Sequence, residues 1–469
     1  MSDDPRVILL EFNELTPALL DRFIADGKLP NFRRFREQST AWITEAEERE
    51  PYLEPWIQWV TVHSGLNYAD HGVFHLNEGH KLRAQQIWDV VSDRGGSVWV
   101  CGSMNVRHDD RLRGCVLPDP WNTHVKPNPV ALEPFFRFVQ QNVLEHTNDQ
   151  VPLQTRDYAR FLGFLAAHGL SAPTVSAVAR QLASERFGGS RWRRAALLDK
   201  FQFDVFRWYF RTHRPTLSTF FLNSTAHYQH AYWDAMEPEL FGRQDAGRER
   251  GDQAEAILYG YQQMDTLIGR FLRLAGKHTT LVLATAMSQE PWIGHDNHGG
   301  GSFYRPRDFH TVTALAGIGS SPRISPVMTE QFFLEFGSEP EAIDAEAKLK
   351  ALRFIEPDQP LLSVERKGTR IFAGCSAHRD VATGVHIGTA AAGGRRSPFF
   401  DLFYKVDTSK TGRHHPDGVL WVRRAPFAAS SHAEKLPLAA VAPSLLRMLG
   451  IAPPEHMRQR PVDLHRLAA

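Results

Sequence analysis

Short apolar runs recur along the chain, with amphipathic segments of helical spacing between them. Val7–Phe12 is apolar except at Glu11 and is too short for a helix, as expected of a parallel strand buried on both faces. Four more core strands are predicted, over Ser97–Cys101, Leu217–Leu222, Leu281–Thr285 and Val419–Val422. Helical periodicity lies between them, in Ile87–Arg94 and Ile257–Leu274. This alternation predicts an α/β fold around a mostly parallel sheet.

The loop after the first strand is the expected position of a site. It begins Asn13-Glu14-Leu15, and Thr16 and Pro17 then suit the N-cap and first position of a helix. In a doubly wound sheet, ligands bind outside the carboxyl ends of the strands. Glu11, Asn13 and Glu14 are therefore expected in that crevice. A charge on Glu11, at the end of an apolar strand, is costly unless it is paired or used.

Two intervals interrupt the alternation. Residues 127–214 carry amphipathic helical segments and no clear strand, which predicts a helical insertion or lid. Residues 324–410 mix a helical stretch, Glu339–Arg353, with strand-like pieces at Thr369–Phe372 and Phe400–Tyr404. We expect a mixed α/β insertion there, with a mobile loop around Gly393–Arg396. The core is then assembled from three parts, 1–126, 215–323 and 411–469.

The composition and the charge argue against several classes of protein. The 469 residues are 42% hydrophobic and carry a net charge of +1, so bulk electrostatics indicate neither a nucleic-acid nor a membrane partner. Three cysteines are too few and too scattered for a disulfide framework or a cysteine-based zinc site. The N-terminus lacks the pattern of a signal peptide, and no run approaches a membrane span. The prediction is a cytoplasmic protein with a small-molecule substrate; the oligomeric state is left open.

Several segments match a known family in order along the chain. They are Val7–Asn31, Pro55–Gly65 followed by Asp70-His71-Gly72-Val73-Phe74, Ala226–Trp233, Gly412–Gly418 and Ala440–Ile451. Together they resemble the type I phosphodiesterase/nucleotide pyrophosphatase branch of the alkaline phosphatase superfamily. The resemblance covers roughly the first 110 residues, 215–310 and 405–469, and leaves both insertions uncovered. It implies a doubly wound, mostly parallel sheet flanked by helices, interrupted by the helical and the mixed insertion.

The resemblance also implies a site, with departures from the family pattern. The family binds two adjacent metals through aspartates and histidines and uses a Thr or Ser nucleophile. His230 and His414 match two of the histidines. The partner aspartate of His230 aligns with Ala226, the first-strand aspartate aligns with Asn13, and a later Asp-His pair aligns with Ala286-Met287. The nucleophile position falls near Glu54 or Pro55, without a hydroxyl.

These departures predict at most one metal ion, because alanine and methionine offer a divalent cation no ligand. His230 and His414 are expected to hold it, with Asn223, Glu11 or Glu54 as the third ligand. His227, four residues after Asn223, offers an alternative register. Two imidazoles, one oxygen and an open position suit zinc, with manganese or magnesium as alternatives. A site without metal is the remaining alternative.

Two functions follow from these expectations. The first is a metal-dependent hydrolase or transferase of a phosphate-type ester, with Glu54 or Glu11 as general base and Asn13 bonded to the substrate. Asn105 and Arg305 are further candidate substrate contacts. The second is a repurposed scaffold that binds a phosphorylated or sugar-linked ligand without two-metal chemistry. The stretch His295–Gly301 is expected to be a flexible loop.

Overall fold

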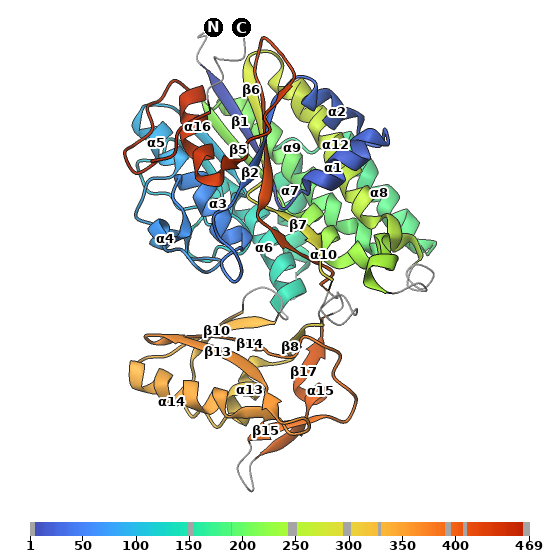
Figure 1. The fold of residues 1–469 in the computed structure, drawn as a ribbon, viewed down its shortest axis with the longest axis vertical. Helices are drawn as coiled ribbons and strands as arrows, with labels where there is room; N and C mark the ends of the chain where they lie inside the picture. Colours follow the sequence, from blue (N-terminus) through green and yellow to red (C-terminus); the bar gives the residue numbers. More distant parts are fainter. Residues whose placement is uncertain are drawn as a thin grey trace. The chain divides into compact units, whose positions relative to one another are not determined.

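The computed structural model describes residues 5–148, 154–188, 190–242, 251–293, 302–326, 330–389, 395–406 and 410–462. The chain divides into two compact units (Figure 1). Unit 1 comprises Met1–Gln140, Leu153–Pro291 and Gly412–Ala469, and unit 2 comprises Gln141–Pro152 and Trp292–Thr411. Each unit is described by itself. No helix among the described residues is both long and apolar enough to cross a membrane.

Unit 1 is built on a nine-stranded sheet with the order β20-β2-β19-β6-β1-β5-β3-β4, and β21 also pairs with β2. Its parallel core consists of β6 (Thr279–Ala284), β1 (Arg6–Phe12), β5 (Leu217–Leu222), β3 (Val98–Cys101) and β4 (Gly114–Leu117). The remaining strands are β19 (Asp417–Arg423), which is antiparallel to β6 and β2, then β2 (Thr40–Glu45), β20 (Ser430–Ser431) and β21 (Leu436–Pro437). The five predicted core strands are confirmed, within two residues at each end.

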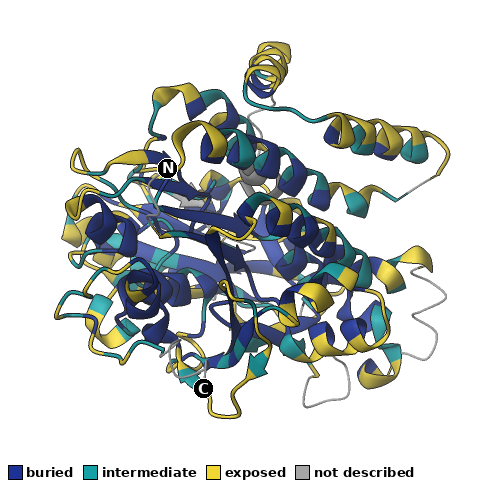
Figure 2. Cartoon of the chain, turned by 90° about the horizontal axis from the view of Figure 1, so that it is seen from above, coloured by how far each residue is buried: buried dark blue, intermediate teal, exposed yellow. Residues whose placement is uncertain are grey.

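Helices cover both faces of this sheet. Figure 2 shows the buried strands passing between helices on either side. One set is α3 (Pro55–Ser64), α5 (Ile87–Asp93) and α16 (Val441–Met448), whose apolar side chains join Val7 and Leu9 in one core. The other set includes α1 (Pro17–Ala25), α2 (Pro30–Arg36), α9 (Ala195–His213) and α12 (Ala256–Ala275). Phe12 of β1 meets Phe32 of α2 edge to face on that side.

The predicted helical interval holds helices throughout its described part. They are η2 (Val130–Leu132), α6 (Glu133–Asn148), α7 (Thr155–Ala167), α8 (Ala172–Arg186), η3 (Arg191–Arg194) and α9. The last of them packs directly on the sheet, because Phe206 of α9 contacts Trp99 of β3 and Phe220 of β5. The interval therefore supplies one layer of the core as well as the helices outside it.

Unit 2 has its own apolar core and two four-stranded sheets. One sheet has the order β13-β14-β10-β9 and the other β12-β11-β15-β16. Their bounds are β9 (Arg323–Pro326), β10 (Gln331–Glu335), β11 (Leu352–Phe354), β12 (Gln359–Pro360), β13 (Leu362–Lys367), β14 (Arg370–Cys375), β15 (His386–Thr389) and β16 (Arg396–Pro398). The helix α14 (Glu339–Lys350) contributes Ala342, Ala345 and Leu349 to the core.

One prediction in unit 2 is corrected. The predicted strand at Phe400–Tyr404 begins as a helical turn, α15 (Phe399–Leu402), and is extended only in β17 (Phe403–Lys405), which pairs with β8 (Tyr304–Pro306). Phe399 is fully buried and stacks on Phe403, so packing of the aromatic run decided the local structure over its strand propensity. Of the predicted mobile loop around Gly393–Arg396, residues 393 and 394 lie outside the described residues, and Arg396 begins β16.

Candidate metal centre

Three side chains from separate elements meet beyond the carboxyl end of β1. They are Glu14, two residues after β1; His230 of α10 (Ser224–Met236); and His414 of β18 (Gly412–His415). Each offers one ligand atom, and these atoms all lie within 4.8 Å of one another. The Glu14 side chain is 2% exposed and that of His230 is 20% exposed. The group is thus buried at the carboxylate and open at one imidazole.

The alternation of side chains along β1 decides which residues at its end face α3 and which lie at this site. Val7 and Leu9 face α3, so Glu11 and Asn13 face α3 as well. Asn13 is held from three sides: its Oδ1 accepts from Trp59 Nε1 at 2.8 Å, and its Nδ2 donates to Asn223 Oδ1 at 2.8 Å and to Glu14 Oε1 at 2.9 Å. Glu14 then adopts a φ of +58°, which is uncommon for a residue with a side chain.

The carboxylate of Glu14 is the centre of the group. Its Oε2 lies 2.9 Å from His230 Nε2 and 3.6 Å from His414 Nε2, and it accepts a hydrogen bond from Gln289 Nε2. Burial acts to raise the pKa of Glu14, but the charges of His230 and His414 and the hydrogen bonds from His230 and Gln289 outweigh it and lower that pKa to about 2. Glu14 is therefore a buried anion.

The contacts of His230 test whether a cation fits here. Its Nδ1 lies 3.0 Å from the carbonyl oxygen of Gly412, which accepts a hydrogen bond and so places a proton on Nδ1. The Nε2 lone pair of a neutral ring would then point at Glu14 Oε2, a repulsive arrangement at 2.9 Å. A positive charge between these atoms, either a second proton or a metal ion, is required. The His₂Glu donor set suits a metal ion with an open position.

His414 connects the group to Glu54. It lies on β18, directly opposite Gln289 in the antiparallel pair with β7 (Ser288–Pro291). Its Nδ1 is 3.5 Å from Glu54 Oε2. Glu54 precedes α3 and is partly exposed. A carboxylate behind one nitrogen of an imidazole favours the orientation in which the other nitrogen faces a cation.

A buried hydrogen-bond network fixes the surroundings. Gln229 Nε2 donates to the backbone oxygen of Glu14 at 2.7 Å, and Gln229 Oε1 accepts from the Tyr261 hydroxyl at 2.7 Å. Thr16 lies at the N-cap of α1 as predicted, but its hydroxyl donates to the backbone oxygen of Gln289 at 2.9 Å and does not cap the helix. The loop after β1 is thereby tied to α10, α12 and β7.

The structure separates the predicted site residues. His230 and His414 come together, and Glu54 lies beside His414. Glu11 is fully buried and its Oε1 is 2.9 Å from His63 Nε2 of α3. Asn223 is a neighbour of Asn13, to which it presents its side-chain oxygen. Glu11 does not belong to the group of three ligand atoms, and the role of Asn223 as a metal ligand stays a prediction.

The two predicted substrate contacts lie elsewhere. Asn105 is fully buried; its Nδ2 donates to the backbone oxygens of Trp56 and His75, and its Oδ1 accepts from the Gly79 amide. Arg305 lies in unit 2 on β8, buried, with its guanidinium over the ring of Phe309. The stretch His295–Gly301 is outside the described residues. The roles of Asn105 and Arg305 stay predictions.

Sequence reasoning missed Glu14 as a ligand, and with it Gln289. The sequence held one signal for Glu14, which is its position directly after Asn13. Asn13 aligns with the first-strand aspartate of the family that the chain resembles, so the carboxylate lies one residue later here. Gln289 likewise comes shortly after Ala286-Met287, which aligns with the Asp-His pair of that family. Ala226, Ala286 and Met287 are buried and apolar. Among the described residues, Glu14, His230 and His414 are the group that could hold a metal ion.

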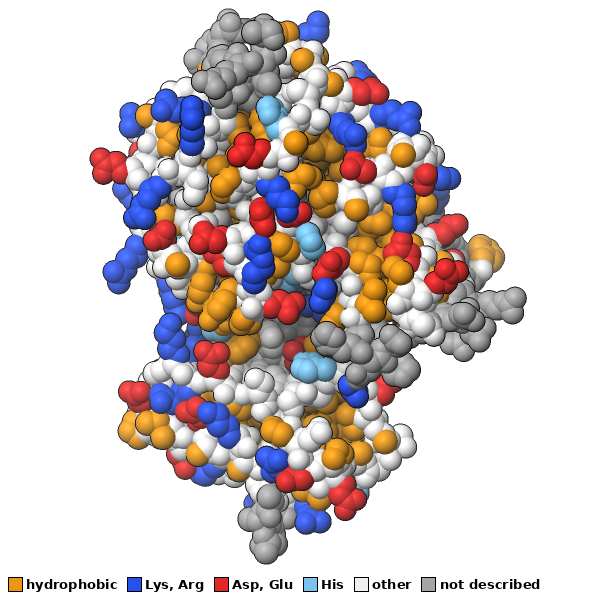
Figure 3. Space-filling model, in the orientation of Figure 1, with side chains coloured by type: hydrophobic (Ala, Val, Ile, Leu, Met, Phe, Trp, Pro, Cys, Tyr) orange, Lys and Arg blue, Asp and Glu red, His pale blue; other side chains and the backbone are white. Residues whose placement is uncertain are grey.

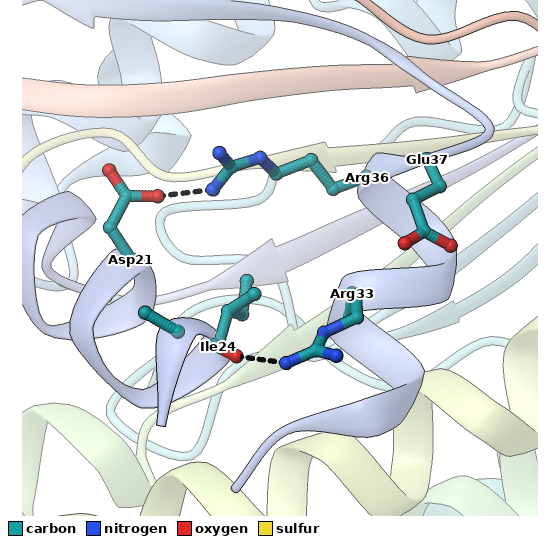
Figure 4. Close-up of a pocket in the computed structure, with 6 residues that line it drawn as sticks. Asp21, Ile24, Arg33, Arg36 and Glu37 are labelled. Carbon is teal, nitrogen blue, oxygen red and sulfur yellow. Dashed lines mark hydrogen bonds and ion pairs between the residues drawn. The ribbon is translucent and has the colours of Figure 1, made fainter. Parts of the chain in front are cut away.

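A hollow of about 630 Å³ lies between α1 and α2 (Figure 4). Three of its charged side chains are engaged: Arg36 pairs with Asp21, and Arg33 Nη2 donates to the backbone oxygen of Ile24 at 2.6 Å. None of its lining residues belongs to the metal centre.

No family model and no curated protein matches the chain. Solved structures similar to it include phosphonoacetate hydrolase from Sinorhizobium meliloti 1021, in complex with phosphonoformate, at 15% identity, 95% coverage of both chains and a TM-score of 0.42. Murine ectonucleotide pyrophosphatase/phosphodiesterase 5, inactive and in complex with AMP, is 10% identical over 97% of both chains, with a TM-score of 0.42. The alkaline phosphatase PafA is 9% identical over 98% of this chain and 99% of its own, with a TM-score of 0.49.

Proposed function

We propose that this protein hydrolyses or transfers a phosphate-type ester with one divalent metal ion, bound by Glu14, His230 and His414. The observation that carries the proposal is the convergence of three ligand atoms within 4.8 Å at the carboxyl end of the central parallel strands. That edge of an open α/β sheet is where ligands bind. Zinc suits two imidazoles and one carboxylate best, and manganese or magnesium is the alternative.

The residues of the site have separable roles in this proposal. A metal ion here supplies positive charge that stabilises the charge developing on a phosphoryl oxygen. Glu14 offsets the charge of the ion from the buried side, and Gly412 holds the His230 ring by its Nδ1. Asn13 and Gln289 restrict the carboxylate of Glu14 by hydrogen bonds. The site is therefore organised before any ligand arrives.

Glu54 is the proposed general base. It is the partly exposed carboxylate at the site, whereas Glu11 is fully buried against His63. A base must reach the proton that it accepts, and only Glu54 of these two is open to solvent. The 3.5 Å contact with His414 Nδ1 keeps Glu54 on the metal side of α3.

One observation favours the second candidate, a metal-free ligand-binding scaffold. Glu14 already accepts hydrogen bonds from the amide groups of Asn13 and Gln289, so its charge is partly satisfied without an ion. A second proton on His230 would complete that arrangement. This alternative binds a phosphorylated or sugar-linked ligand at the same crevice without turnover.

Turnover measurements distinguish the two candidates. The metal-stripped protein is assayed with aryl phosphate monoesters, phosphodiesters and sulfate esters before and after addition of zinc, manganese or magnesium. We expect metal-dependent turnover of at least one class, and a fall in kcat of about 100-fold in Glu54→Gln with the metal content unchanged. Glu45→Gln, at a similarly exposed carboxylate of β2, is the matched control.

Two results oppose the proposal. If the metal-loaded protein turns over none of the esters, the proposal of a hydrolase or transferase is refuted. Thermal stabilisation by phosphate-containing ligands that needs no metal, without turnover, supports the scaffold instead.

A further inference from the structure

The outer face of α8 is apolar where a surface helix is normally polar. Its exposed positions include Val175, Ala179, Leu182 and Ala183, which recur at helical spacing on one side, and Phe187 follows the last turn. Leu182 is 55% exposed and Phe187 is 85% exposed. An amphipathic helix normally turns such a stripe toward the core. On the face of the molecule drawn in Figure 3, exposed hydrophobic side chains are otherwise interspersed with charged ones.

The preceding helix repeats the pattern. Tyr158 and Leu162 are exposed on α7, while Phe161, Phe164 and Leu165 of the same helix are buried. Of the ten large hydrophobic side chains that are exposed among the described residues, five lie between positions 158 and 187. A concentration of this kind marks an interaction surface, since scattered single residues are the ordinary case.

Both α7 and α8 are anchored to their neighbours, so their exposed side chains are not a sign of poor packing. Asp204 of α9 accepts hydrogen bonds from the backbone and hydroxyl of Ser171, at the start of α8. Gln181 Nε2 donates to the backbone oxygen of Ser190 at 2.9 Å. The ring of Phe161 stacks on Phe138 at 3.8 Å between centroids. The inner sides of both helices are thus fixed, and the outer sides remain available.

Positive charge accompanies the apolar face. Residues 154–214 contain ten arginines and one lysine against four acidic residues, an excess of seven in a chain of net charge +1. Four arginines of these two helices are exposed, Arg156 and Arg160 of α7 and Arg180 and Arg186 of α8. The two helices carry two acidic residues: Asp157 accepts a hydrogen bond from the backbone N–H of Gln154, and Glu185 pairs with Arg194. The four arginines outnumber these carboxylates, so the two helices present apolar side chains together with a net positive charge.

We propose that the exposed faces of α7 and α8 bind an anionic phospholipid membrane surface. Apolar side chains inserted at the headgroup level, with arginines at their flanks, are the combination that holds helices in that plane. Self-association fits less well, because a two-fold interface buries the same patch of both copies and so brings two positively charged surfaces together. A nucleic acid would use the arginines and leave Leu182 and Phe187 unsatisfied. The proposal is independent of the metal centre.

Vesicle flotation of the full chain tests the proposal. We expect binding to phosphatidylcholine vesicles with about 30% phosphatidylglycerol and little binding to phosphatidylcholine alone, weakening as salt is raised. The double variant Leu182→Asp with Phe187→Asp is expected to bind at least about tenfold more weakly. Ile343→Asp, at a hydrophobic side chain of α14 that is 50% exposed, should bind as the wild type does. Circular dichroism and thermal melting check that each variant is folded.

Three results overturn it. Absence of binding to the anionic vesicles by the folded wild type refutes it directly. Binding that falls in Arg180→Gln with Arg186→Gln but survives in the Leu182 and Phe187 variant assigns the face to a polyanion. A dimer in solution that the Leu182 and Phe187 variant converts to monomer assigns it to a second copy of the chain.

Discussion

At the residue scale, two buried glutamates are each paired with a histidine. Glu11 and Glu14 lie on either side of the end of β1, and each faces an imidazole nitrogen at 2.9 Å. The first pair, with His63, is fully enclosed. The second pair, with His230, opens to solvent at the histidine. Of these two pairs, the pair of Glu14 and His230 has a further ligand atom beside it, on His414. The enclosed pair of Glu11 and His63 is therefore structural, and the partly open pair belongs to the candidate metal site.

The enclosed pair leads to a stability prediction. Glu11→Ala or His63→Ala leaves one buried polar partner without the other and should destabilise unit 1 by about 3–5 kcal/mol. The double change of Glu11 and His63 to leucine should recover most of that loss, because both polar groups are then removed together. Thermal melting of the three variants checks the difference. Single variants as stable as the double variant would contradict it.

Asp119, which follows β4, gives a prediction for pH. Burial raises the pKa of Asp119 to about 7, against backbone N–H bonds from Asn105 and Trp121 that lower it. A carboxyl whose pKa is raised in the folded state contributes stability below its unfolded pKa and loses it as the pH rises through 7. From pH 5 to pH 8, Asp119→Asn should therefore gain about 2–3 kcal/mol relative to the wild type. Melting temperatures at the two pH values test this, and a difference that does not change with pH would refute it.

At the element scale, the antiparallel pair of β7 and β18 positions half of the centre. His414 and Gln289 are partners across the pair, and Gly412 carries the oxygen that orients His230. A Cβ on Gly412 would stand 2.3 Å from Gln289 Oε1 and 2.9 Å from the backbone oxygen of Gln229. The strand can therefore approach α10 only with glycine at this position.

Gly412→Ala should weaken metal binding by about 10- to 100-fold, because it moves the groups that orient the ligands. Gly319→Ala is the control, since a Cβ there meets no atom within 4 Å. Zinc affinity measured by chelator competition distinguishes the two variants. Equal affinities in both would show that the spacing of β18 and α10 does not set the site.

The sequence predicted five strands of the central sheet and most helices of unit 1, because buried strands are short apolar runs and the helices between them are periodic. It did not predict β2 or β4. Through the family resemblance it named His230, His414 and Glu54 as site candidates, and the structure places these three side chains close together. It could not predict Glu14, because only the backbone conformation after Asn13 decides which carboxylate enters the site. It could not separate Glu11 from the site either, since that requires His63 of α3, more than 50 residues later.

At the scale of the whole molecule, the net charge of +1 is the sum of one strongly basic segment and an acidic remainder. Residues 154–214 carry an excess of seven positive charges, so the rest of the chain carries an excess of six negative charges. The expectation of no membrane partner rested on the total. The distribution along the chain and the burial of individual side chains are what indicate the exposed face of α7 and α8.

The two units lead to a prediction about folding. Pro291 and Gly412 are direct partners in the pair of β7 and β18, so the ends left by removing Trp292–Thr411 are adjacent. Replacement of that segment by Asn-Gly should close a two-residue hairpin and leave unit 1 folded. Circular dichroism and metal content check the outcome. A chain that melts without cooperativity would show that unit 1 depends on unit 2.

The measurement that tests the central claim most directly is the metal content of the purified protein by elemental analysis. We expect about one zinc or manganese ion per chain in the wild type and in His227→Ala, which changes a histidine of the same helix outside the group. We expect loss of the ion in Glu14→Gln, His230→Ala and His414→Ala. A wild type that holds no metal after reconstitution, or variants that keep it, would contradict the assignment of Glu14, His230 and His414 as a metal centre.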